Sequence, residues 1–171
     1  MKKITLNAFI LLIALNIFSN ENDSLLIILD THIENRDAYI NIKETRIDSL
    51  RNLIIKETSL GKQYEINKKI FDEFHTYKYD SAMYYILKNK DIAYKLEKKQ
   101  YIAEVQINIS KLLSTAGLIN ESLNNISSLN RVELDSSLLF VYYETMENIY
   151  YTAKNYSNDS IYTPEYKKIE R

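Results

Sequence analysis

Glycine and proline are nearly absent from this chain: two glycines and one proline occur in 171 residues. Strands are joined by turns, and turns depend on these two residue types. Helices joined by short polar connections need few of either. The scarcity therefore predicts an all-α protein, and the length suffices for one domain with a core of its own.

The N-terminus has the layout of a secretory signal peptide. Lys2 and Lys3 precede an apolar run from Ile4 to Phe18, and the small residue Ser19 is followed by polar residues. We expect residues 1–19 to be a signal peptide cleaved after Ser19, which predicts an exported, periplasmic protein. The run is short for a membrane span of roughly 20 residues. If it stays uncleaved, it would act as an anchor and would be the only part that touches a membrane.

The charged residues do not follow a pattern typical of catalysis. The net charge is −1 with acids and bases interspersed, so we expect no nucleic-acid binding by this segment. Cysteine is absent, and there is no glycine-rich phosphate loop, nucleophile elbow or HExxH motif. His32 and His75 fall on different predicted helices, and Glu144 and Glu147 could share a face but have no histidine beside them. We therefore expect no enzyme, and no catalytic, metal or cofactor site.

Residues 24–60 predict one long amphipathic helix. Asp23 and Ser24 can cap its start, and Gly61 suits its C-terminal end. One apolar row recurs at every seventh residue: Leu26, Ile33, Ile40, Ile47 and Ile54. The companion row is only partly apolar, which favours packing on the protein's own helices over a dimeric coiled coil. A break near Thr58 or earlier is compatible with the pattern. The charges between the apolar positions are either a solvated face or a contact face for a partner.

After Gly61 the chain divides into shorter helical segments that predict antiparallel pairs. Apolar residues return at helical spacing within 62–77, 80–96, 101–116, 120–129 and 135–153. Asp80 and Asn120 are the predicted caps of two of them, and Gly117 is a predicted helix end.

Two of the helix joints can be superposed with an offset of 40 residues. Tyr79 and Ala82 in the first joint match Ile119 and Ser122 in the second, and a weaker third copy lies at 152–159. Such a period predicts helix pairs stacked over residues 62–160. The small residues would let neighbouring helices approach closely.

These joints resemble a degenerate tetratricopeptide repeat (TPR), through Gly117, Ile119, Ser122 and Ile126 with the small residue Ser110 before them. The stretch LDTHIENRDAYINIKETRIDSL at 29–50 is similar to the start of the exported region of Bacteroidetes TPR regulators that carry an uncharacterised domain. The matching residues are Leu29, Asp30, Ile33, Arg36, Asp37, Tyr39, Lys43, Glu44, Arg46, Ile47, Asp48 and Leu50. The resemblance implies a right-handed α-solenoid in which a long N-terminal helix precedes antiparallel pairs.

The resemblance also implies a role. Proteins of that kind continue with more repeats, a membrane-spanning helix, a coiled coil and a DNA-binding helix-turn-helix. Here residues 161–171 begin a further helix, with Thr163 as cap and Pro164 after it, and we expect this helix to be truncated. We expect a protein- or peptide-binding module that forms the periplasmic sensory part of a membrane-anchored transcriptional regulator. The alternatives are a self-contained periplasmic scaffold that self-associates and, with the least support, a helical-bundle enzyme.

Tyrosines come from successive predicted helices. In a repeat superhelix the inner helices line a groove, where a tyrosine offers contact area and one hydroxyl. We expect a partner-binding groove lined by Tyr84, Tyr101, Tyr143 and Tyr150. The alternative is that these rings form half-buried helix surface.

Overall fold

The computed structural model describes residues 24–156, and within this range it contains helices and no strands. The elements are α2 (Arg36–Lys56), α3 (Leu60–Phe74), α4 (Tyr79–Lys95), α5 (Lys99–Thr115), α6 (Ile119–Ser127), a 3-10 turn η1 (Arg131–Glu133) and α7 (Ser136–Tyr156). Residues 24–34 are also helical. The predicted all-α class is thereby confirmed. The predicted signal peptide at 1–19 and the predicted helix start at 161–171 lie outside the described residues.

The chain divides into two compact units, one ending at Arg46 and the other beginning at Ile47. In the first unit the predicted continuous helix is interrupted at Asn35, a turn residue. The Asn35 side-chain amide donates to the Thr31 carbonyl at 2.8 Å, and the Asn35 backbone N–H donates to the same oxygen at 3.1 Å. A side chain that bonds nearby backbone in this way offers the chain an alternative to regular helix.

The end of the predicted long helix also lies elsewhere. α2 ends at Lys56, residues 57–59 are not helical, and Gly61 falls in the first turn of α3 instead of ending α2. The Glu57 carboxylate accepts the Ser59 backbone N–H at 2.9 Å, and the Gln63 amide donates to the Glu57 carbonyl at 2.6 Å. These polar contacts stabilise a tight connection at the point where the sequence allows a break.

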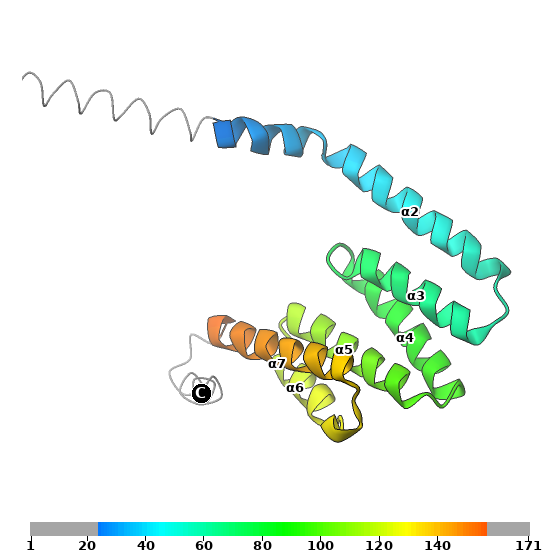
Figure 1. Ribbon diagram of the computed structural model, residues 1–171. Helices are drawn as coiled ribbons and strands as arrows, with labels where there is room; N and C mark the ends of the chain where they lie inside the picture. Colours follow the sequence, from blue (N-terminus) through cyan, green and yellow to red (C-terminus); the bar gives the residue numbers. More distant parts are fainter. Residues whose placement is uncertain (1–23, 157–171) are drawn as a thin grey trace, which may run out of the picture. The chain divides into compact units, whose positions relative to one another are not determined.

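Within the second unit, α3 and α4 pack together, as do α5 and α6, and α7 lies against both α5 and α6 (Figure 1). Two apolar clusters meet at α5. Val105 and Leu112 belong to a cluster shared with α2, α3 and α4, while Ile107 belongs to one shared with α6 and α7. A helix that contributes to the core on both sides is what a stack of helix pairs requires, because each pair buries its face only against the next.

Two helices are each followed by a residue in the left-handed backbone conformation. Gly117 follows α5 with φ of +79°, and Glu97 follows α4 with φ of +52°. At each end the next backbone N–H reaches back to a carbonyl five residues earlier, from Lys98 to Ala93 and from Leu118 to Leu113. This is the Schellman arrangement, for which glycine is the favoured residue.

Helix starts differ by one residue from the predicted caps. α4 begins at Tyr79 and α6 at Ile119, so Asp80 and Asn120 are the second residues of their helices instead of the caps. The residues in the cap positions, Lys78 and Leu118, make no side-chain cap hydrogen bond. Asp80 still favours α4, and Glu121 favours α6, because an acidic residue in the first turn of a helix interacts favourably with the helix dipole.

The predicted packing residues lie at the helix joints. Ala82 and Ser122 are fully buried, Tyr79 is 37% exposed, and Ile119 packs partly buried on the α5–α7 cluster. The Ser122 hydroxyl donates to the Ser110 carbonyl on α5 at 2.7 Å.

A pair of amides completes the contact between α5 and α6. The Gln106 side chain donates to the Asn125 carbonyl at 2.6 Å, and the Asn125 side chain donates to the Gln106 carbonyl at 2.7 Å. Asn125 donates as well to the Ser110 hydroxyl at 2.7 Å. The joint is therefore held by hydrogen bonds between small and amide side chains as much as by apolar contact.

Candidate functional site: the outer face of α7

A hollow of about 850 Å³ lies along α7. Its described lining is aromatic and acidic: Arg131, Tyr142, Tyr143, Glu144, Met146, Glu147, Asn148, Tyr150 and Tyr151. Tyr143 is 52% exposed and Tyr151 62% exposed, so large ring surfaces face outward here. We call this feature the α7 hollow.

The position of the hollow follows from how α7 packs. Tyr142, Thr145, Ile149 and Ala153 are buried, at spacings of three and four residues that define one face of a helix. The opposite face must then present Tyr143, Glu147 and their neighbours outward. The helix start is fixed by Asp135, whose carboxylate accepts the Leu138 backbone N–H at 2.9 Å and the Ser137 hydroxyl at 2.7 Å. These hydrogen bonds hold the pKa of Asp135 below its usual value.

The carboxylates of the hollow carry no internal partner. Neither the Glu144 side chain nor the Glu147 side chain takes part in a hydrogen bond or ion pair within residues 24–156. Tyr142 is only 5% exposed, yet it lines the hollow, and its hydroxyl has no hydrogen-bond partner among the described residues. Arg131 supplies the one positive charge of the described lining. The hollow therefore offers oxygen atoms and ring faces to a ligand.

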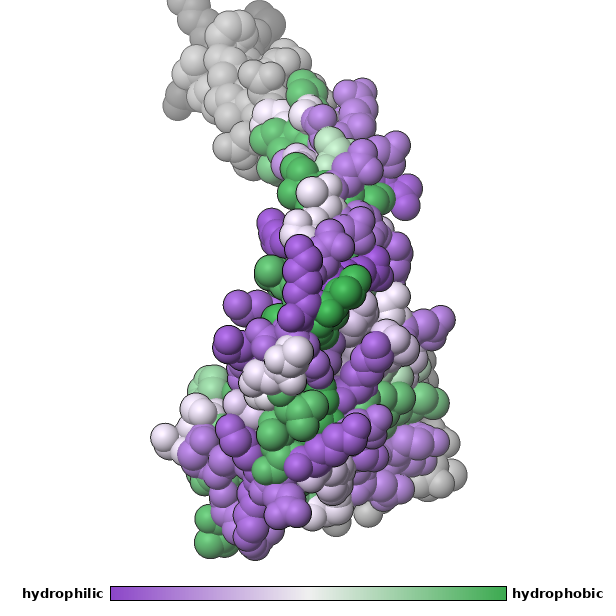
Figure 2. Space-filling view, turned by 90° about the vertical axis from the view of Figure 1, so that its right-hand side faces the viewer, coloured by the Kyte–Doolittle hydropathy of each residue, from purple (hydrophilic) through white to green (hydrophobic). Residues whose placement is uncertain are grey.

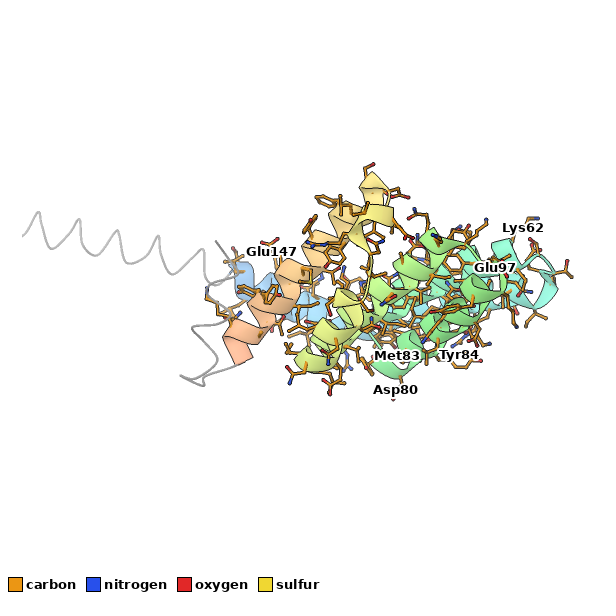
Figure 3. The ribbon with its side chains drawn as sticks, turned by 90° about the horizontal axis from the view of Figure 1, so that it is seen from below. Lys62, Asp80, Met83, Tyr84, Glu97 and Glu147 are labelled. Atoms are coloured by element: carbon orange, nitrogen blue, oxygen red, sulfur yellow. The ribbon has the colours of Figure 1, made fainter. Side chains whose placement is uncertain are left out.

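The structure brings together two of the four tyrosines predicted to line a groove. Tyr143 and Tyr150 line the α7 hollow. Tyr101 instead stacks on Tyr64 of α3 with ring centroids 4.0 Å apart, and its hydroxyl donates to Glu65 at 3.2 Å. Tyr84 lies on α4, well away from Glu147 of α7 (Figure 3). The four rings thus do not share one surface: Tyr101 belongs to the contact between α3 and α5, and Tyr84 is exposed on α4, where its ring contacts Tyr85 and Lys88 of the same helix.

A polar network at the α3–α5 contact was not anticipated. Tyr64 is 1% exposed, and its hydroxyl donates to the Glu104 carboxylate at 2.7 Å, while Lys68 pairs with the other oxygen of the same carboxylate. Burial raises the pKa of Tyr64 well above its usual value, and the Glu104 charge adds to the effect. In the sequence Tyr64 looks like an ordinary core residue, and its partner 40 residues away carries no local signal.

Comparison with known families decides what kind of domain this is. A family model described as the SusR N-terminal TPR domain matches residues 33–171. The chain belongs to this family. The match confirms the tetratricopeptide character predicted from Gly117, Ile119 and Ser122. No curated protein and no solved structure matches the chain.

Membership of the SusR N-terminal TPR family places the domain among non-catalytic helical-repeat scaffolds, which typically mediate protein–protein interaction. No group of three His, Asp or Glu residues that could hold a metal ion occurs in residues 24–156. His75 stacks on Phe71 and hydrogen-bonds the Asp72 carbonyl, and His32 contacts the Tyr39 hydroxyl at 3.0 Å. Over the same range no helix is both long enough and apolar enough to cross a membrane.

Proposed function

We propose that the chain is a non-enzymatic protein- or peptide-binding module whose contact site is the α7 hollow. The observation that carries this proposal is the combination, on one helix face, of exposed tyrosine rings with carboxylates that have no partner within the described part of the chain. Aromatic residues are enriched in protein interfaces because they offer large rigid area. The family supports the proposal, since it is a family of helical-repeat interaction domains.

The test of the site is peptide selection on the purified full chain. A library of random dodecapeptides displayed on phage is selected against the wild type, and selected peptides are measured on variants by fluorescence polarisation. We expect Tyr143→Ala and Tyr151→Ala each to weaken binding by about tenfold or more, as truncated interface anchors do. Tyr84→Ala, which removes an equally exposed ring from α4, should bind as the wild type does. Equal binding by all three variants would show that the hollow is not the site.

We further propose that the domain is the periplasmic sensory part of a membrane-anchored transcriptional regulator. Two observations support this: the SusR N-terminal TPR family and the signal-like layout of residues 1–19. The test is fractionation of a Gram-negative host that expresses the full chain with a C-terminal tag. The tag should be degraded by protease added to spheroplasts, and Leu12→Arg, which interrupts the apolar run, should protect it. If the tag is protected both in cells that express the wild type and in cells that express Leu12→Arg, export is refuted.

A second candidate function is self-association through residues 24–34. Leu25, Ile28 and Ile33 are 64%, 54% and 60% exposed, an unusual share of apolar surface for one short helical segment. Figure 2 shows apolar and polar side chains interspersed on the surface it presents. Sedimentation of the full chain, with Ile28→Asp and Ile33→Asp as variants, tests this candidate. A strict monomer at high concentration would contradict it.

A further inference from the structure

We propose that the α7 hollow recognises a basic side chain of the partner peptide, with arginine favoured over lysine. This inference rests on the proposed function, because it names the ligand chemistry of the same surface. It is argued from the charges, the ring faces and the free hydroxyl of the hollow.

Two carboxylates of the hollow can attract a cation. Glu144 and Glu147 are one helical turn apart and therefore share a face of α7, where Figure 3 marks the place of Glu147. Neither carboxylate has a cationic partner in residues 24–156, and Arg131 brings the described lining to a net charge of −1. A cation placed between two carboxylates in a partly enclosed hollow is held more strongly than one on open surface.

The tyrosine rings offer a second kind of contact to a cation. At two tyrosines outside the hollow a lysine lies over the ring: Lys88 lies 4.5 Å from the ring centre of Tyr84, and Lys98 lies 4.7 Å from that of Tyr101. Tyr143 of the hollow has no such cation within the described residues. The chain thus shows the contact that the hollow lacks, and a ligand cation would complete it.

Tyr142 adds a hydroxyl group to the lining of the hollow. Tyr142 is 5% exposed, and its hydroxyl has no hydrogen-bond partner in the described part of the chain. The hydroxyl oxygen is not among the buried unpartnered atoms of the described residues, so it is accessible, and it can donate or accept a hydrogen bond. The hollow therefore offers this hydroxyl and the carboxylates of Glu144 and Glu147 as separate acceptors for N–H groups. Arginine presents five such donors in a fixed fork, whereas lysine presents three on a single nitrogen.

The experiment uses the dodecapeptides selected on the wild-type full chain. Their sequences should be enriched in arginine at one position, and replacing that arginine by glutamine should weaken binding. The double variant Glu144→Gln/Glu147→Gln, which keeps shape and removes charge, should bind them about five- to tenfold less tightly at low salt. The matched control is Glu97→Gln/Glu121→Gln, which removes two exposed carboxylates outside the hollow and should bind normally. Tyr142→Phe should lower the preference for arginine over lysine.

Failure of this inference is distinguishable from failure of the proposed function. If Tyr143→Ala abolishes binding while the glutamine double variant binds as the wild type does, the hollow is a peptide site and the basic ligand is refuted. If the selected peptides carry acidic residues and lose affinity with Arg131→Gln, the ligand has the opposite charge, which also refutes it. If Tyr143→Ala and Tyr151→Ala both bind as the wild type does, both proposals fall.

Discussion

Replacing Ser122 by leucine tests the idea that small residues let the helices of this domain approach closely. Ser122 is fully buried and donates a 2.7 Å hydrogen bond to Ser110 on the neighbouring helix. Loss of that hydrogen bond costs about 1 kcal/mol, and forcing extra methylenes into a packed contact costs about 1–3 kcal/mol. Ser122→Leu should therefore lower the free energy of unfolding by about 2–4 kcal/mol, and Ser122→Ala by about 1 kcal/mol.

Urea unfolding followed by far-UV circular dichroism measures both effects. With an m-value of about 2 kcal/mol per molar, a loss of 3 kcal/mol moves the midpoint by about 1.5 M. Ser127→Leu makes the same chemical change at an exposed position of α6 and should stay within about 0.5 kcal/mol of the wild type. The reasoning is refuted if Ser122→Leu and Ser127→Leu unfold alike. If Ser122→Ala is as damaging as Ser122→Leu, the hydrogen bond matters and the size of the residue does not.

Three further changes have expected outcomes. Tyr64→Phe removes a buried hydrogen bond to the Glu104 carboxylate and should cost about 1.5–3 kcal/mol in urea unfolding; an unchanged midpoint would contradict the role of the network. Gly117→Ala places a side chain at φ of +79° where no atom lies within 4 Å, so it should cost about 1–2 kcal/mol through backbone strain alone; Glu97→Gly should have the opposite sign at φ of +52°, and matching signs for the two variants would disprove the strain argument. The lowered pKa of Asp135 means that its contribution is present at neutral pH and lost as pH falls below its usual 3.8 through the lowered value, so Asp135→Asn should flatten the acid side of a plot of unfolding midpoint against pH; an unchanged slope would rule this out.

The helices could be predicted from the sequence, because helix-breaking residues such as glycine and proline act locally, and stretches without them can be read directly. What lies against a helix could not be predicted in the same way. Ile33 and Ile47 belong to one heptad row, yet Ile33 is 60% exposed and Ile47 fully buried. Periodicity tells which side of a helix is apolar, whereas burial depends on which other element reaches that side. The same limit explains the break at Asn35, where one side-chain hydrogen bond competes with the helix.

The candidate site could be predicted only in part, because the use of each tyrosine ring depends on which residues lie beside it in space. Tyr84 and Tyr143 have nearly equal exposure, 53% and 52%. Their difference lies in their neighbours: Lys88 covers the Tyr84 ring, while the Tyr143 ring lines a hollow. Sequence spacing does not encode which ring faces are already in use.

The paired amides between α5 and α6 restrict how this domain could be rearranged or copied. Gln106 and Asn125 each donate to the other's backbone carbonyl, so the two side chains satisfy each other only in one axial alignment of the helices. Transplanting α6 into another repeat protein would succeed only if the recipient helix carried an amide at the position of Gln106. For anyone who builds chimeras from these repeats, the transferable unit is therefore the α5–α6 pair and not the single helix.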